Sequence, residues 1–206
     1  PKISHKIAKC ILDKLIKHST MKRYLISEEN NNNVYFHNAP QYWIRAINFK
    51  PYFWNEREGQ KLSTQVKTLF LSSRIYTDIT SAILNSSLFY WWFIVFSDCR
   101  HLNLREIESF PIDLSSISVE VSKRLADLVE DLMIDLRKHK QRKTCQYQTT
   151  GKVIYDEFYP RYSKPIIDQI DCVLAEHYGF TDEELDFIIN YDIKYRMGGE
   201  AGEDEA

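Results

Sequence analysis

Residues 84–96 read Leu84-Asn85-Ser86-Ser87-Leu88-Phe89-Tyr90-Trp91-Trp92-Phe93-Ile94-Val95-Phe96 and form the longest apolar stretch of this 206-residue chain. The stretch is shorter than the roughly 18 residues that a membrane span needs. Polar residues interrupt it near its start, and Asp98 and Arg100 follow it closely. Its length and composition therefore favour a helix buried in the core of a globular protein.

The segments around this stretch also have helical spacing. Aromatic and aliphatic residues recur with a helical period in 76–84 and 87–96, and a short helix is expected over 104–110, ending before Pro111. The longest predicted helix is 119–140, with Ser118 as its N-cap. Its expected apolar face consists of Val121, Leu125, Leu128, Leu132 and Leu136.

Further helices are expected at the C-terminal end. Ser163-Lys164-Pro165 predicts the start of a helix that ends at Gly179, and Thr181-Asp182-Glu183-Glu184 has the pattern of a capping box for a last helix. Residues 141–162 have no clear period and are expected to be irregular. Gly198–Ala206 is expected to be a frayed acidic tail.

The N-terminal part mixes one helix with strands. A helix is expected over 3–17, strands over 34–37, 42–49 and 65–71, and a loop over 51–62. This layout predicts an α+β fold with a basic, strand-rich front packed on helices, one long helix and a C-terminal helical pair. The expected sections are a basic, strand-rich region (1–115), a long supporting helix (116–142) and a C-terminal helical segment with an acidic tail (143–206).

Charge is distributed unevenly along the chain. The net charge is −2, but residues 1–75 hold 13 Lys and Arg against 5 Asp and Glu, whereas residues 151–206 hold 5 against 14. The basic front suits contact with phosphates. The 4 cysteines are scattered, and no signal peptide is recognisable, which predicts reduced thiols in a cytoplasmic protein without a membrane partner.

The common catalytic motifs do not occur in this sequence. The glycines form no phosphate-binding loop, the His and Cys residues have no zinc-ligand spacing, and no GxSxG is present. No metal site is therefore expected. Asp168 and Asp171 lie three residues apart, as nuclease carboxylates can, but such spacing is common on solvated helix faces. Asn38-Ala39-Pro40-Gln41-Tyr42-Trp43 is interpreted as a tight turn, since it departs from the Asn-Pro-Pro-aromatic motif of amino-methyltransferases.

Basic residues interleaved with aromatic ones provide the candidate DNA-binding residues. Arg and Asn can contact guanine and adenine edges, and Lys can anchor phosphates. The candidates are Trp43, Arg45, Asn48, Lys50, Arg57, Lys61, Lys67, Arg74, Arg100 and His101. The alternative is that the aromatic residues belong to the core and the cations only line its rim.

Three parts of the chain resemble one protein family. They are Ile83–Trp92, the pair Ser97–Leu102 and Ile107–Ile112, and the C-terminal runs from Ser163 to Gly198. Together they resemble the C-terminal region of type II restriction–modification adenine DNA methyltransferases, including fused restriction–methylation (type IIG-like) enzymes. The resemblance covers about residues 34–198.

The resemblance implies a target-recognition domain that reads double-stranded DNA, and it makes residues 1–115 the DNA target-recognition region. In that family a separate N-terminal domain binds S-adenosylmethionine and methylates adenine, and neither of its motifs occurs here. This chain is therefore expected to hold no cofactor and to position DNA for a catalytic domain on the same or a companion chain. The competing hypothesis is a protein-interaction module of a restriction–modification complex, which binds a partner through the long helix and the acidic end.

Overall fold

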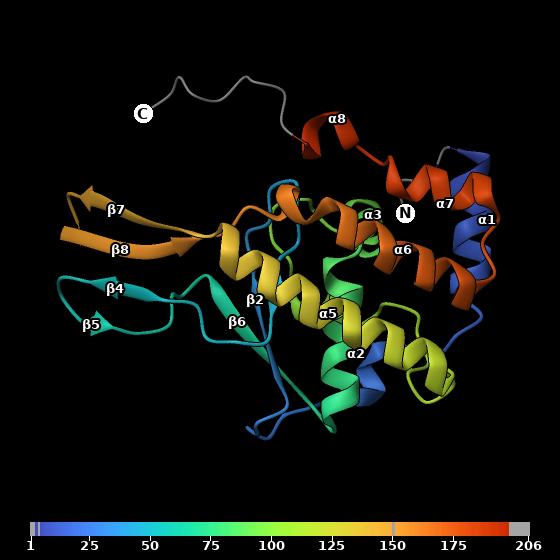
Figure 1. Cartoon of the computed structure of the whole chain (residues 1–206), viewed down its shortest axis with the longest axis horizontal. Helices are drawn as coiled ribbons and strands as arrows, with labels where there is room; N and C mark the ends of the chain where they lie inside the picture. The colour runs from blue at the N-terminus through green and yellow to red at the C-terminus, as the bar shows by residue number, and fades with distance from the viewer. Residues whose placement is uncertain (1–2, 4, 150, 198–206) are drawn as a thin grey trace.

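The structure is a computed structural model that describes residues 3, 5–149 and 151–197. It is an α+β fold, as the sequence predicts, with two four-stranded antiparallel sheets beside a helical body (Figure 1). The helices are α1 (Lys6–Leu15), α2 (Arg74–Asn85), α3 (Ser87–Phe96), α4 (Leu104–Glu108), α5 (Val119–His139), α6 (Lys164–Tyr178), α7 (Asp182–Ile189) and α8 (Ile193–Arg196). The strands are β1 (Leu25–Ile26), β2 (Asn33–His37), β3 (Ala46–Ile47), β4 (Phe53–Asn55), β5 (Gly59–Gln60), β6 (Val66–Leu71), β7 (Gln141–Tyr147) and β8 (Gly151–Glu157).

Helices α2 and α3 form the centre of the core. Ser86 separates them: its hydroxyl donates to the carbonyl of Ile83 at 2.6 Å and accepts from the amide of Phe89 at 3.0 Å. One side chain thus ends α2 and caps α3. Trp91, Phe89 and most other residues of α3 are buried, as expected. Among the described helices, none alone is long and apolar enough to cross a membrane, and α2 and α3 reach that length only together, across a 67° bend.

Helix α5 is confirmed, but its buried face is rotated from the expected one. Ser118 caps it, and Leu125, Leu132 and Leu136 are buried as predicted. Leu128 and Val121 are only half-buried, because the fully buried positions between the leucines are Val129 and Met133. The buried residues of α5 therefore recur with the 3.6-residue period of a helix packed on α2 and α6. They do not follow the strict heptad repeat of a coiled coil.

The two C-terminal helices end and begin as the sequence predicts. Gly179 adopts a left-handed conformation (φ 66°) after α6, which a residue without Cβ does readily. Thr181 and Glu184 form the predicted capping box of α7. The expected acidic tail, 198–206, lies outside the described residues.

The first sheet has the order β1-β6-β2-β3, and α2 packs against it. Strands β2 and β6 match their predictions closely. The strand expected over 42–49 is wrong for most of its length, since only Ala46–Ile47 pairs with β2. The carbonyl of Tyr42 instead accepts a hydrogen bond from Arg196 of helix α8, and the indole of Trp43 donates to the carbonyl of Arg196.

The second sheet was not expected at all. Its order is β5-β4-β8-β7, and it joins the predicted loop 51–62 to the predicted irregular segment 141–162. Figure 1 shows this sheet extending away from the helices. Because β4 and β8 lie about one hundred residues apart in the sequence, the sheet links the first expected section to the third. One hydrophobic core likewise contains residues from all three sections.

Candidate nucleic-acid interface

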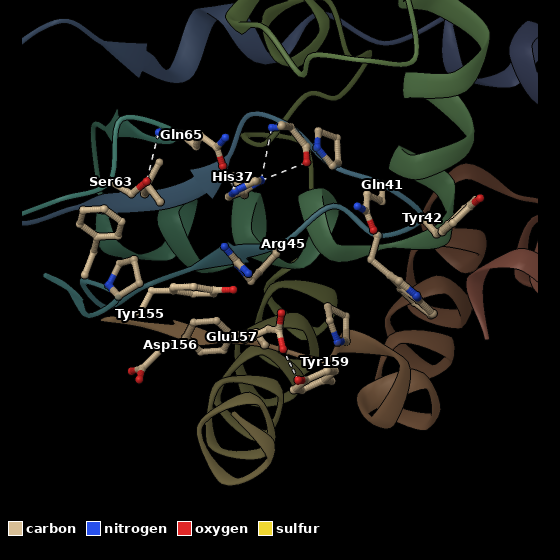
Figure 2. Close-up of a pocket in the computed structure, with 18 of the residues that line it drawn as sticks. His37, Gln41, Tyr42, Arg45, Ser63, Gln65, Tyr155, Asp156, Glu157 and Tyr159 are labelled. Atoms are coloured by element: carbon tan, nitrogen blue, oxygen red, sulfur yellow. Dashed lines mark hydrogen bonds between the residues drawn. The ribbon is translucent and has the colours of Figure 1, made fainter. Parts of the chain in front are cut away.

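A cleft with a volume of about 1110 Å³ lies between the two sheets. One wall is formed by the end of β2, the segment 39–45 and the residues before β6, and the other by β4 and β8. Helix α8 lines it as well. Figure 2 shows His37 and Gln65 on one side, Tyr155, Glu157 and Tyr159 on the other, and Arg45 between them.

Arg45 is the most unusual residue of this cleft. Its guanidinium lies 4.9 Å from the ring centre of Phe158. Burial lowers the pKa of Arg45 to about 10, although the negative charge of Glu157 opposes this shift. Its guanidinium forms no hydrogen bond or ion pair with any described residue. Arg45 is thus a partly desolvated cation whose donors are free to bind something else.

The carboxylates around the cleft already have partners. Glu157 accepts a hydrogen bond from the hydroxyl of Tyr159 and pairs with Lys143 at 3.6 Å. Asp156 pairs with Lys140 at 2.7 Å and with Arg142 at 2.5 Å, and Figure 2 shows its carboxylate directed away from Arg45. These contacts neutralise the acidic side chains without using Arg45.

His37 belongs to the opposite wall. Its Nδ1 lies 3.1 Å from the carbonyl oxygen of Ala39, and its Nε2 lies 3.0 Å from Oε1 of Gln65. Burial, and then the charge of Arg45, lower the pKa of His37. The histidine is therefore held neutral beside the arginine, so that Arg45 is the charged group of the pair at neutral pH.

Helix α8 lines the cleft because Arg196 binds Tyr42 and Trp43. The indole Nε1 of Trp43 donates to the carbonyl of Arg196 at 2.6 Å, and the guanidinium of Arg196 lies 4.2 Å from the ring centre of Trp43. Nε of Arg196 also donates to the carbonyl of Tyr42. Trp43, a predicted DNA-binding residue, is partly buried against the core and lines the cleft.

The second sheet presents a polar face on the side opposite the cleft. Strand registers place Trp54, Ile154 and Thr144 side by side, with Arg142 and the Gln146–Lys152 pair on the same face. We refer to the exposed polar residues of this face, Gln60, Arg142, Thr144, Gln146 and Lys152, as the outer face. Strands β7 and β8 carry four of these five residues, and a two-stranded β-ribbon fits the width of the DNA major groove.

The sequence did contain a signal for the outer face. Between Asp135 and Asp156 there are six Lys and Arg residues and no Asp or Glu. This run was missed because the sheet that presents it forms only when β8 pairs with β4, far away in the sequence. Charge counted over long segments also hid it, since the middle third of the chain is nearly neutral.

The structure divides the predicted DNA-binding residues among several places. Lys50, Arg57 and Lys61 lie around β4 and β5 of the second sheet, and Lys61 pairs with Glu58 at 2.8 Å. Lys67 is exposed on β6 of the first sheet. These four cations and the outer face belong to the strand-rich half of the molecule.

Asn48 and Arg74 are found elsewhere. They line a smaller depression of about 460 Å³ between α2 and α5, where Asp78, Asp127 and Glu130 also lie. Nε of Arg74 pairs with Asp78 at 3.0 Å. The acidic surroundings make this depression a poor phosphate site.

Arg100 and His101 are exposed in the loop after α3. Their backbone amides donate to the carboxylate of Asp98 at 2.8 and 3.0 Å. The amide of Leu102 donates to the carbonyl of Asn38 at 2.9 Å, which places this loop beside the segment that lines the cleft.

The acidic pair considered as nuclease residues has structural roles. Both carboxylate oxygens of Asp171 accept backbone amides at the start of α3, from Ser87 at 3.1 Å and from Leu88 at 3.2 Å. Asp168 pairs with Lys164. In the part of the chain that the structure describes, no group of three His, Cys, Asp or Glu residues could hold a metal ion.

Comparisons of the chain with models of protein families, with curated protein sequences and with solved structures gave no match.

Proposed function

We propose that this chain is a DNA target-recognition domain of a cytoplasmic restriction–modification adenine DNA methyltransferase. The observation that carries the proposal is the outer face, which combines cations with amide and hydroxyl side chains on a sheet that extends away from the helical body (Figure 1). Cations anchor phosphates, whereas Gln and Arg side chains can read base edges. The motif resemblance described above supplies the methyltransferase context.

The chemistry of the outer face suits a major groove. Gln146 and Gln60 can each offer a donor and an acceptor to adenine, and Thr144 can bond to either type of edge. Lys152 is exposed and forms no ion pair with a described residue, so it is free to meet a phosphate. The guanidinium of Arg142 stacks on Tyr52, 3.8 Å from its ring centre, and pairs with Asp156, and both contacts hold it in place beside these side chains.

The proposal assigns methylation to a separate catalytic domain. That domain would bind S-adenosylmethionine and extrude the adenine, while this chain holds the duplex. The absence of the glycine and Asn-Pro-Pro-aromatic motifs from the sequence supports this division. Tight binding of S-adenosylmethionine to the isolated chain in calorimetry would contradict it.

Salt-dependent duplex binding tests the proposal. Fluorescence anisotropy of a labelled duplex with a randomised centre, titrated with the full chain from low salt upward, is expected to show affinity that falls steeply with salt. Four to six phosphate contacts predict a slope of log K against log salt of about −4 to −5. Absence of binding at the lowest salt would contradict the proposal.

A protein-interaction module is the second candidate. Ile134 on α5 is 56% exposed and lies at the acidic depression beside Glu130 and Asp127, a surface suited to a partner with basic residues. If a methyltransferase catalytic domain binds the chain tightly while DNA does not, this function replaces the first.

A further inference from the structure

The cleft between the sheets contains a cation, Arg45, whose guanidinium lies over the ring of Phe158 and forms no hydrogen bond or ion pair with any described residue. Arg45 extends between the two walls. A guanidinium presents five N–H donors in a planar fork that matches phosphate or carboxylate oxygens. Partial burial without a hydrogen bond or ion pair is unfavourable for the free protein, and a bound anion would remove this cost.

The remaining charges of the cleft also favour an anion. Four Lys and Arg side chains line it, against two carboxylates. The carboxylates are those of Asp156 and Glu157, which are engaged by Lys140, Arg142, Lys143 and the Tyr159 hydroxyl. The cations Arg45 and Lys194 therefore face a cleft with little negative charge of its own.

The rest of the lining suits a planar ring. Tyrosine and phenylalanine residues contribute from the second sheet and the residues beside it, from the segment 39–45 and from α8, and the tyrosines include Tyr147, Tyr155 and Tyr159. Bases stack on such rings regardless of their sequence. Gln41 and Gln65 also line the cleft and carry amides that can bond to a base edge. The volume exceeds what one nucleotide fills, so an adjoining piece of strand also fits.

We infer that this cleft binds a nucleotide unit, with its phosphate on the guanidinium of Arg45 and its base against the tyrosines of β8 and the segment that follows it. The unit is either a free nucleotide or an unpaired nucleotide of a single strand. The inference is independent of duplex binding by the outer face, because the cleft lies on the opposite side of the second sheet.

Calorimetric titration of the full chain tests this site. The probes are dAMP, inorganic phosphate, a single-stranded hexathymidylate and a hexaglutamate peptide. We expect dAMP and hexathymidylate to bind, and phosphate to bind at least about tenfold more weakly than dAMP because it lacks a base. Binding by hexathymidylate but not dAMP assigns the site to a strand, and equal binding per nucleotide assigns it to a free nucleotide. Failure of both, or tighter binding of the peptide than of either, overturns the inference.

Two variants connect the binding to Arg45. Arg45→Met keeps the packing on Phe158 and removes the charge, so nucleotide affinity is expected to fall at least about tenfold while the melting temperature stays the same or rises. Arg23→Met, at an exposed arginine that does not line the cleft and belongs to no proposed binding surface, is the matched control and should leave affinity unchanged. If Arg45→Met does not fold, Arg45→Lys keeps the charge but loses the planar fork and should still weaken binding. Unchanged affinity in a folded Arg45 variant overturns the assignment of the phosphate to Arg45.

Discussion

The side chain of Asn85 bonds to both backbone polar groups of Ala46. Its Oδ1 accepts from the Ala46 amide at 3.2 Å, and its Nδ2 donates to the Ala46 carbonyl at 2.7 Å. Nδ2 also donates to the carbonyl of Ser81 within α2. The Asn85 side chain therefore satisfies the backbone groups of Ala46 as a paired strand would. It joins the last turn of α2 to β3, directly after Arg45.

This contact gives a stability prediction. Asn85→Ala would leave the buried amide and carbonyl of Ala46 without partners on that side, and we expect a loss of about 2–4 kcal/mol in the free energy of unfolding. Chemical denaturation measures it. Asn190→Ala, which removes an exposed amide bonded to Asp186, is the control and should cost under about 0.5 kcal/mol. Equal costs for the two variants would show that Asn85 does not hold β3.

The rotated face of α5 gives a second prediction. Leu132→Ala truncates a fully buried side chain and should cost about 2–5 kcal/mol, whereas Leu128→Ala truncates a half-buried one and should cost clearly less. Denaturant titrations of both variants measure the difference. A larger cost at Leu128 would restore the leucine face expected from the sequence.

Asp171 gives a prediction about pH. Burial raises the pKa of Asp171 to about 6, against the effect of the Ser87 and Leu88 amides. An acid whose pKa is raised in the folded state contributes stability that is present below about pH 4 and is lost as the pH rises through 6. The stability advantage of the wild type over Asp171→Asn should therefore shrink by on the order of 1–3 kcal/mol between pH 4 and pH 7.

Denaturation of both proteins at each pH unit between 4 and 7 measures this difference. Comparison with Asp171→Asn cancels the other titrating groups, among them His37 and His177, whose pKa values are lowered by burial. An advantage that grows with pH would mean that the carboxylate is stabilised in its ionised form.

Lys152 tests the phosphate contacts of the outer face. Lys152→Ala should weaken binding to all duplexes alike and make the salt slope shallower by about one unit, because one counterion fewer is released. The sequence predicts the same uniform loss of affinity and the same shallower slope for Lys67→Ala, on the first sheet. Lys123→Ala is the control, since Lys123 is exposed at the opposite end of α5 from the second sheet (Figure 1). A slope that changes equally in the control would show a non-specific charge effect.

Local sequence patterns were sufficient for most helices and for β2 and β6. Ser86, Ser118 and the Thr181–Glu184 capping box act within one turn of their own position, so their neighbours in the sequence determine what they do. The burial of the aromatic residues of α3 likewise follows from composition alone.

The candidate site could not be predicted in the same way. Strand β8 forms a local hairpin with β7, but the cleft wall forms only where its other edge pairs with the distant β4, and Trp43 binds Arg196, which is 153 residues away in the sequence. Both events depend on contacts between distant residues. Arg45 was recognised as a binding candidate from its type, but its place between two sheets required the structure.

The most direct test of sequence recognition is selection of bound sequences from a randomised duplex pool by the full chain. We expect enrichment of a defined site by the wild type, and loss of preference at one position with Gln146→Ala, whose amide is proposed to read an adenine. Binding without enrichment of any sequence, or the same preference in the Gln146→Ala, Thr144→Ala and Gln60→Ala variants, would contradict recognition by the outer face.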